Sequence, residues 1–316
     1  LSLFVTLLLA AGATVVAIVL GLVTVWVDRK VTARVQMRVG PPFRQPFYDI
    51  AKYCIKDTCV PAASVRWLFL AAPLVGFAGA AVAAAILLRA LLAGEAVTGD
   101  LIVVLYLLLL PALSVILGAI SSRNPIAALG GSREMTLLFS YELPLLLAVL
   151  VPVVQAFVGA PELFVQGQRN LAAQLDLAAL LDSPAAVTRP SGVLALAVGV
   201  LCMQAKLTLV PFDIPEAETE LTGGAYIEYS GPPLAVYKLT RAMMMFVLPT
   251  FLITVFCGGL SFHGLGFVLW YLVLVTLAVL LKNTAPRLRI DQALKFFWGP
   301  VALTALLAVA LAYLGW

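Results

Sequence analysis

Charge, histidine and paired cysteine are all scarce in this sequence. Only 11% of its 316 residues are charged, whereas 63% are hydrophobic and the mean hydropathy is +1.06. A soluble domain cannot hide so many apolar side chains from water, so the composition excludes that class and indicates an integral membrane protein. A single histidine, His263, and four cysteines without a C-x-x-C pair exclude a metal or iron–sulfur site built from this chain alone. We expect plain buried or interfacial thiols at Cys54, Cys59, Cys202 and Cys257.

Long apolar runs dominate the rest of the chain. Crossing about 30 Å of hydrocarbon takes a helix of about 20 apolar residues. The sequence therefore predicts an all-α integral membrane protein with eight transmembrane helices. Prolines inside these runs are expected to kink the helices rather than end them, at Pro111, Pro144, Pro152 and Pro249. The runs are residues 2–27, 67–93, 101–120, 135–158, 192–211, 233–257, 265–282 and 296–315.

The basic residues sort to one side of the predicted membrane. Of 20 Lys and Arg residues, 17 fall in connections that share one side, and the exceptions are Arg89, Arg169 and Arg189. Because cytoplasmic connections carry the excess of Lys and Arg, both termini are predicted to lie outside. This explains the net charge of +4, so no nucleic-acid partner is expected. We predict a single multi-pass domain, residues 1–316, in a prokaryotic cytoplasmic (inner) membrane, with cytoplasmic loops at 28–66, 121–134, 212–232 and 283–295.

The first cytoplasmic loop contains a different kind of helix. In its segment PFRQPFYDIAKYCIKD, Phe43, Phe47, Ile50 and Cys54 recur at the spacing of one helical face. This pattern predicts an amphipathic helix at the membrane surface after the first span. Two interpretations stay open: an interfacial anchor whose lysines meet lipid phosphates, or a surface on which Asp49 and nearby arginines face a docked protein or a cavity.

Two acidic residues lie at the start of the fourth predicted span and within it. Glu134 follows the glycine pair 130–131, which predicts a tight turn, and Ser132, a candidate N-cap, so it would lie in the first turn of the helix. Helix capping and a functional role are both open for it. Glu142 lies about 12 Å deeper at about 1.5 Å per residue. A carboxylate at the bilayer centre costs about 2.5 to 3.5 kcal/mol, so Glu142 is a functional candidate, compensated by Lys206 or by a protein-lined water channel.

The chain is organised around the stretch from Lys206 to Arg241. Carboxylates near low dielectric repel one another and raise each other's pKa, which indicates proton chemistry or an unseen cationic partner. We expect Asp213 to cap a short helix on which Glu216 and Glu220, at i and i+4, titrate as a coupled set. The alternative is a solvated acidic loop that docks onto basic residues of this or a neighbouring subunit. The acids are Asp213, Glu216, Glu218, Glu220 and Glu228, with no Lys or Arg among them.

Three long motifs occur in a fixed order on this eight-span chain. They are RVGPPFRQPFYDIAKYCIKD, SREMTLLFSYELP and PFDIPEAETELTGGAYIEYSG. Together they resemble the family of the complex I membrane-arm linker subunit, which is the quinone-site subunit of complex I. The resemblance is closest to the membrane subunit of energy-converting membrane-bound NiFe hydrogenases (group 4, formate hydrogenlyase-like). Two features favour that branch: GPP runs straight into RQPFYD, and EYSG is followed by PPLAVYKL.

The resemblance implies a membrane-anchoring, energy-coupling subunit with no catalytic residue, metal or cofactor of its own. The NiFe centre and iron–sulfur clusters would belong to partners: the soluble hydrogenase large and small subunits and an iron–sulfur subunit, with antiporter-like membrane subunits and the lipid bilayer beside them. Ion-coupling carboxylates, serving H+ or Na+ translocation, are implied at Glu142, Asp213, Glu216, Glu218, Glu220, Glu228 and Glu134. A cavity and docking surface is implied at Arg29, Arg34, Arg38, Asp49, Lys52 and Lys206.

Two alternatives to the hydrogenase remain. One keeps the fold and makes the chain the quinone-binding membrane subunit of a complex I type NADH or related dehydrogenase, in which case a quinone is the ligand. The other is a free-standing secondary ion transporter. The sequence shows no clear internal repeat and no matched pair of short, glycine-interrupted spans, which are typical of such transporters.

Overall fold

The computed structural model describes residues 3–93, 99–159, 176–182, 184–216, 220, 222–258 and 264–316. In these ranges the chain is helical with no strand, which confirms the all-α prediction. The α-helices are α1 (Leu3–Val35), α2 (Gln45–Ile55), α3 (Arg66–Ala93), α4 (Asp100–Leu107), α5 (Leu110–Ser121), α6 (Pro125–Gly159), α8 (Leu177–Asp182), α9 (Pro190–Lys206), α11 (Gly231–Phe256), α13 (Leu265–Thr284), α14 (Ile290–Phe296) and α15 (Ala302–Tyr313). Short 3-10 turns are η2 (Ala186–Thr188) and η3 (Gly224–Tyr226), and η4 (Phe297–Val301) is a π-helical segment.

Seven helical segments of the described chain are long and apolar enough to cross a membrane. Two of them are composite, because α4 and α5 form one segment and α14, η4 and α15 form another. The remaining predicted span corresponds to α9, which has 17 residues and ends at Lys206 instead of reaching residue 211. The helix stops there because Thr208 adopts a left-handed backbone (φ 49°), which a right-handed helix cannot contain.

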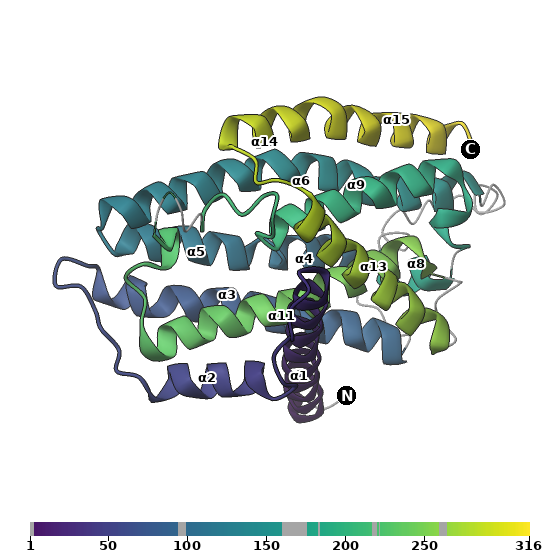
Figure 1. Cartoon of the computed structure of the whole chain (residues 1–316). Coiled ribbons are helices and arrows are strands. Elements are labelled where there is room, and N and C mark those ends of the chain that lie inside the picture. Colours follow the sequence, from purple (N-terminus) through teal and green to yellow (C-terminus); the bar gives the residue numbers. More distant parts are fainter. Residues whose placement is uncertain are drawn as a thin grey trace.

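The spans pack in layers with one helix set across them. α15 lies on α6 and α9, α6 also contacts α5, and α3 packs between α5 and α11. Figure 1 shows α1 nearly end-on, so it crosses α3 and α11 steeply. Almost every side chain of α11 from Ala242 to Phe256 is buried, so this helix forms the centre of the bundle.

Helix α6 begins ten residues earlier than predicted. It starts at Pro125 and continues through Gly130 and Gly131, so the predicted turn and the Ser132 cap are wrong. The hydroxyl of Ser132 instead donates back to the Leu129 carbonyl inside the helix. The glycines serve close packing, since a Cβ on Gly130 would lie 2.6 Å from the backbone nitrogen of Ala225.

The predicted amphipathic helix after the first span is present as α2. It packs against α1 and α11, and the Phe43 ring just before it meets the Trp26 ring of α1 edge-on with centroids 5.2 Å apart. The predicted apolar face is only partly covered, because Phe43 and Cys54 are exposed. The helix therefore rests on the bundle and keeps one side open.

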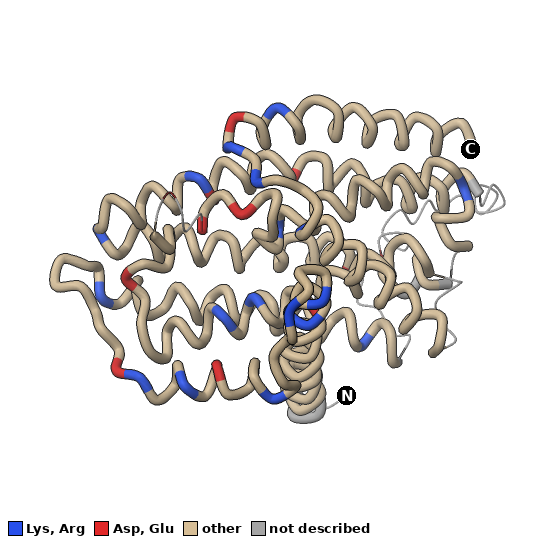
Figure 2. The backbone as a smooth tube through the Cα atoms, viewed as in Figure 1, with Lys and Arg blue, Asp and Glu red and all other residues tan. Residues whose placement is uncertain are grey.

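Charged residues gather at one end of the bundle. Figure 2 shows most of the Lys, Arg, Asp and Glu bands at the left of the view and where α1 ends in its middle. Few of them lie at the end of the bundle near the C-terminus. This is the end that carries α2 and the loop after α9.

Candidate functional site

The deepest charged contact of the described chain joins α6 to α9. Lys206 Nζ lies 3.1 Å from Glu142 Oε2, and the side chains are 1% and 15% exposed. The ammonium also lies 5.4 Å from the centroid of the Tyr141 ring, a cation–π contact. Glu142 is thus compensated by Lys206, the first of the two means that the sequence offered. Lys206, one of the residues implied for a cavity and docking surface, is buried and faces the interior.

A cavity of about 50 Å³ lies beside this pair, between α5, α6, α9 and α11. Glu134, Lys206 and Arg241 all line it, together with Thr208 and Tyr226. A water molecule needs roughly 10 to 15 Å³ measured this way, so the cavity has room for a few waters. It is far smaller than the roughly 300 to 1,000 Å³ of ligand pockets, so within this chain it suits water and protons rather than an organic ligand.

Glu134 enters this cavity from the interior of α6. The side chain is 3% exposed, and among the described residues its Oε2 has no hydrogen-bond partner. Because α6 begins at Pro125, Glu134 does not lie in the first turn, and the helix-cap interpretation is wrong. The sequence could not show this, because the glycine pair is equally compatible with a turn and with a closely packed helix.

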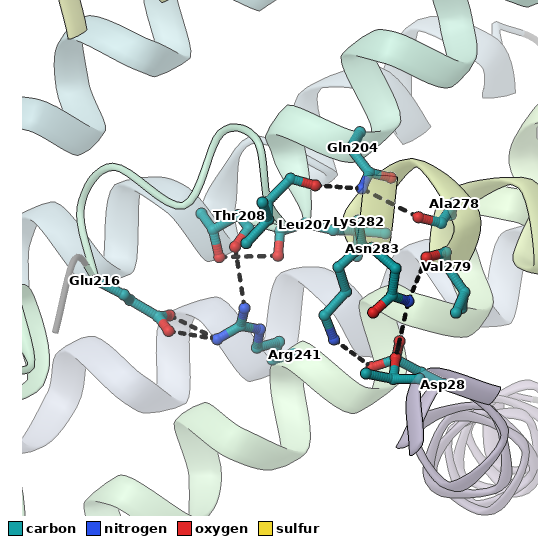
Figure 3. Close-up of polar contacts among 12 residues, drawn as sticks. Asp28, Gln204, Leu207, Thr208, Glu216, Arg241, Ala278, Val279, Lys282 and Asn283 are labelled. Carbon is teal, nitrogen blue, oxygen red and sulfur yellow. Dashed lines mark hydrogen bonds and ion pairs between the residues drawn. The ribbon is translucent and has the colours of Figure 1, made fainter. Parts of the chain in front are cut away.

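Arg241 of α11 also lines the cavity. Its Nη1 donates to both carboxylate oxygens of Glu216, at 2.7 and 2.6 Å, while Nη2 donates to the Thr208 carbonyl at 3.1 Å (Figure 3). Burial alone would raise the pKa of Glu216, but the charges of Arg241 and Lys238 and the hydrogen bond from Arg241 hold it below its ordinary value. Glu216 is therefore an ionised member of a tight pair.

Asp213 is held by the connection between α13 and α14. Arg287 Nη2 lies 2.5 Å from Asp213 Oδ2, and the Leu288 amide donates to the Pro211 carbonyl at 3.0 Å. Burial and the neighbouring charge of Glu216 raise the pKa of Asp213 in spite of the Arg287 hydrogen bond. For Asp213 the predicted upward shift of the pKa is found.

The remaining acids of the loop lie nearer the surface. Glu220 is half exposed and pairs with Arg133 of α6 at 2.6 Å, which lowers its pKa. Glu228 accepts a hydrogen bond from Asn124 Nδ2 at 2.5 Å. Glu218 lies outside the described residues, as does most of the short helix expected to carry Glu216 and Glu220.

Three of the described acids of the loop are individually paired with arginines, although the charge of Glu216 still raises the pKa of Asp213. Asp213, Glu216 and Glu220 each meet a different arginine of this chain, from the connection before α14, from α11 and from α6. The alternative in which the loop docks onto basic residues of its own subunit therefore describes these contacts better. Sequence spacing missed them because the partners lie 25 to 87 positions away.

The predicted docking surface is partly ordered by its own contacts. Arg29 Nη1 lies 2.7 Å from Asp49 Oδ2, which ties α1 to α2. Burial would raise the pKa of Asp49, but hydrogen bonds from Arg29 and Gln45 outweigh it and lower the pKa. The side chains of Arg34, Arg38 and Lys52 are exposed on the same end of the molecule.

A second polar cluster was not predicted. Lys282 Nζ of α13 lies 2.8 Å from Asp28 Oδ2 of α1, and Asn283 Nδ2 donates to Thr32 at 3.2 Å (Figure 3). Asp28 is only 5% exposed. The sequence signal was present, since an acid and an asparagine at the ends of two spans are costly unless paired. Their pairing depended on which helices are neighbours.

Within the described residues no group of three or more His, Cys, Asp or Glu could hold a metal ion. The charged contacts of the site are instead separate ion pairs between helices and loops. A family model described as NADH dehydrogenase matches residues 7–313 of the chain.

The chain belongs to that family. It is 32% identical to a subunit of the NADH-quinone oxidoreductase of Anoxybacillus flavithermus, over 97% of this chain and 94% of the relative. It is 34% identical to a subunit of an NADH-quinone oxidoreductase of Syntrophobacter fumaroxidans, over 92% of this chain and 91% of the relative. The family predicted from the three motifs is confirmed, and the chain is a multi-pass membrane subunit of complex I-like type.

A solved structure adds a second kind of relative to the family. A chain of the membrane-bound sulfane sulfur reductase, described as an archaeal respiratory membrane complex, aligns with a TM-score of 0.82 and 25% identity. The alignment covers 97% of this chain and 99% of that one. The family member described here therefore has relatives in at least two kinds of redox complex.

Proposed function

We propose that this chain is the membrane-anchoring and energy-coupling subunit of a multi-subunit, complex I-like redox complex, and specifically of a membrane-bound NiFe hydrogenase. One observation carries the coupling role: Arg241 and Lys206, the cations of the ion pairs with Glu216 and Glu142, both line one small cavity that Glu134 also lines. A change of charge at Glu216, in the loop after α9, can thereby reach Glu142 of α6 through the charged groups around this cavity.

The exposed basic residues of α1 and α2 support the proposed partners. These cations would form a positively charged surface on which the soluble hydrogenase subunits and their iron–sulfur subunit dock. Antiporter-like subunits would respond, within the membrane, to the change of charge at the coupling acids. The NiFe centre would belong to the soluble partners. The choice of hydrogenase rests on the GPP to RQPFYD junction and on the PPLAVYKL continuation.

A second candidate is favoured by the names of the relatives. Two of them, at 32% and 34% identity, are subunits of NADH-quinone oxidoreductases. In that function the same chain would take part in a quinone site, and the coupling acids would keep their places.

Affinity purification in mild detergent through a tag on this chain tests the choice of complex. Subunits, nickel, iron and bound quinone are measured on one sample. Stoichiometric nickel and iron without quinone are expected. Flavin, iron and quinone without nickel would establish the quinone function instead, and sulfane sulfur reduction without nickel would place the complex with the archaeal relative. Ion flux through the purified chain alone would support the alternative of a free-standing secondary ion transporter.

The coupling role is tested by Glu142→Gln and Glu134→Gln in the same complex. Both variants should keep redox turnover and lower the number of ions moved per turnover. Glu134→Gln is the cleaner variant, because Glu134 Oε2 gives up no hydrogen bond. Asp291→Asn, at an exposed acid of α14, is the control. Normal ion stoichiometry in both variants would refute the coupling role.

A further inference from the structure

The guanidinium of Arg241 binds two groups at once, the Glu216 carboxylate and the Thr208 carbonyl. Nη1 alone donates to both carboxylate oxygens of Glu216, and Nη2 donates to the Thr208 carbonyl. The strongest arginine to carboxylate geometry is a fork of two parallel N–H bonds to two oxygens. That fork is not formed with Glu216, because only Nη1 of Arg241 donates to this carboxylate.

A second carboxylate faces the same cavity as this guanidinium. Glu134 approaches from α6 while Arg241 approaches from α11, and both line the cavity. The other charged or titratable groups around it are Lys206 of α9, which is engaged by Glu142, and the phenols Tyr226 and Tyr237. A buried carboxyl oxygen without a hydrogen bond is tolerated when the group is neutral, so Glu134 carries a proton while Arg241 stays with Glu216.

The backbone that Arg241 holds is strained. Thr208 is β-branched and has φ of 49°, in the left-handed region, a conformation that β-branched residues rarely adopt. Its carbonyl is one of the contacts that keep the turn after α9 in place. Removing Arg241 from this carbonyl would therefore loosen the start of the acidic loop.

From these contacts we infer that Arg241 is a two-position switch, which moves between Glu216 and Glu134 and frees the Thr208 turn in the second position. The step balances in charge and protons: protonated Glu134 and the ionised Glu216 pair become an ionised Glu134 pair and protonated Glu216. One proton moves from Glu134 to Glu216, and the arginine moves the opposite way, so the cavity keeps its net charge. The inference deepens the proposed coupling role and rests on it, but its test is independent of ion pumping.

Infrared spectroscopy of the purified complex tests the switch. The difference spectrum between wild type and Glu134→Gln isolates the protonated-carboxyl band of Glu134. Glu216→Gln mimics protonated Glu216, so Arg241 should move to Glu134, and this band should be lost. Glu220→Gln, a change in the same loop at an acid paired with Arg133, should leave the band in place. A band absent from the wild type, or one that persists in Glu216→Gln, would overturn the inference.

Hydrogen exchange gives a second readout if Glu216→Gln does not assemble. Glu134→Gln removes the ionisable acceptor for Arg241, so the backbone of residues 207–216 should exchange more slowly than in wild type. A merely structural Glu134 would leave this exchange unchanged or speed it, and either result would overturn the switch. If exchange slows as expected while ion stoichiometry stays normal, the switch stands and the proposed coupling role fails.

Discussion

The ion pair of Lys206 with Glu142 places two opposite charges inside the helix bundle, with the lysine almost completely enclosed. Such a pair adds little net stability, because the cost of removing both charges from water offsets their attraction. Removing one partner is different, since it leaves the other charge buried and unpaired. The pair is therefore better explained by function than by stability.

A double-mutant cycle measures this pair. Lys206→Met should lower the free energy of unfolding by about 3 kcal/mol, because it leaves the Glu142 carboxylate without its cation. The double variant Lys206→Met with Glu142→Leu should recover most of that loss, since two apolar side chains of similar volume replace the pair. Denaturation in mixed detergent gives all values. A double variant no more stable than Lys206→Met would contradict this account.

The Arg29 to Asp49 pair gives a pH dependence with a definite sign. The pKa of Asp49 lies below its ordinary value, so the folded protein binds this proton less tightly than the unfolded chain. The pair therefore stabilises the docking of α2 on α1 above about pH 4, the ordinary range of aspartate. The contribution is lost as the pH falls through the lowered pKa.

Because both side chains are partly exposed, the effect is small, about 0.5 kcal/mol. A spin label on the exposed side of α2 should gain mobility on acidification in wild type. In Asp49→Asn the label should be more mobile already at pH 7 and should lose the acid-dependent step, whereas Asp291→Asn should behave as wild type. An acid-dependent step of equal size in Asp49→Asn would assign the effect to another group.

At the level of elements, close helix contacts depend on glycines whose faces are specific. Gly21 of α1 lies so near the Ala242 carbonyl of α11 that a Cβ has no room, whereas a Cβ on Gly12 of the same helix would meet nothing within 4 Å. In membranes such small residues let backbones approach and set which helices pair. The steep crossing of α1 over α11 depends on this contact (Figure 1).

The two glycines form a matched pair of alanine substitutions. Gly21→Ala should lower the free energy of unfolding by about 1 to 3 kcal/mol, because the added methyl pushes α1 off α11. Gly12→Ala should leave stability unchanged or raise it by up to about 1 kcal/mol, since alanine is the better helix former. Thermal unfolding in detergent compares them. Equal effects at both positions would show that α1 does not pack as described.

For the whole molecule, the asymmetry of charge predicts the orientation in the membrane. With 17 of 20 Lys and Arg residues on one side, both termini should lie outside. Alkaline phosphatase fused after Trp316 should be active, and a green fluorescent protein fused there should be dark. The same reporters inserted between Thr284 and Ile290 should give the reverse pattern. A fluorescent C-terminal fusion would invert the topology and move the acidic loop outside.

Composition and pattern were sufficient for the class of this protein. Apolar runs of membrane length predict helices because the backbone must satisfy its own hydrogen bonds in hydrocarbon. The amphipathic spacing around Asp49 predicts α2 for a similar reason, and the three motifs predict the family. All these inferences use local information: length, period and order.

Tertiary structure alone decided how the charges are paired. Glu216 meets Arg241, Asp213 meets Arg287 and Glu134 faces a shared cavity, because helices distant in the sequence become neighbours. The sequence left open both repulsion among the acids and their docking onto basic residues, and only the fold shows which arginine pairs with each acid. An ion pair requires two groups within about 4 Å, and that distance is a property of helix packing, which no local pattern contains.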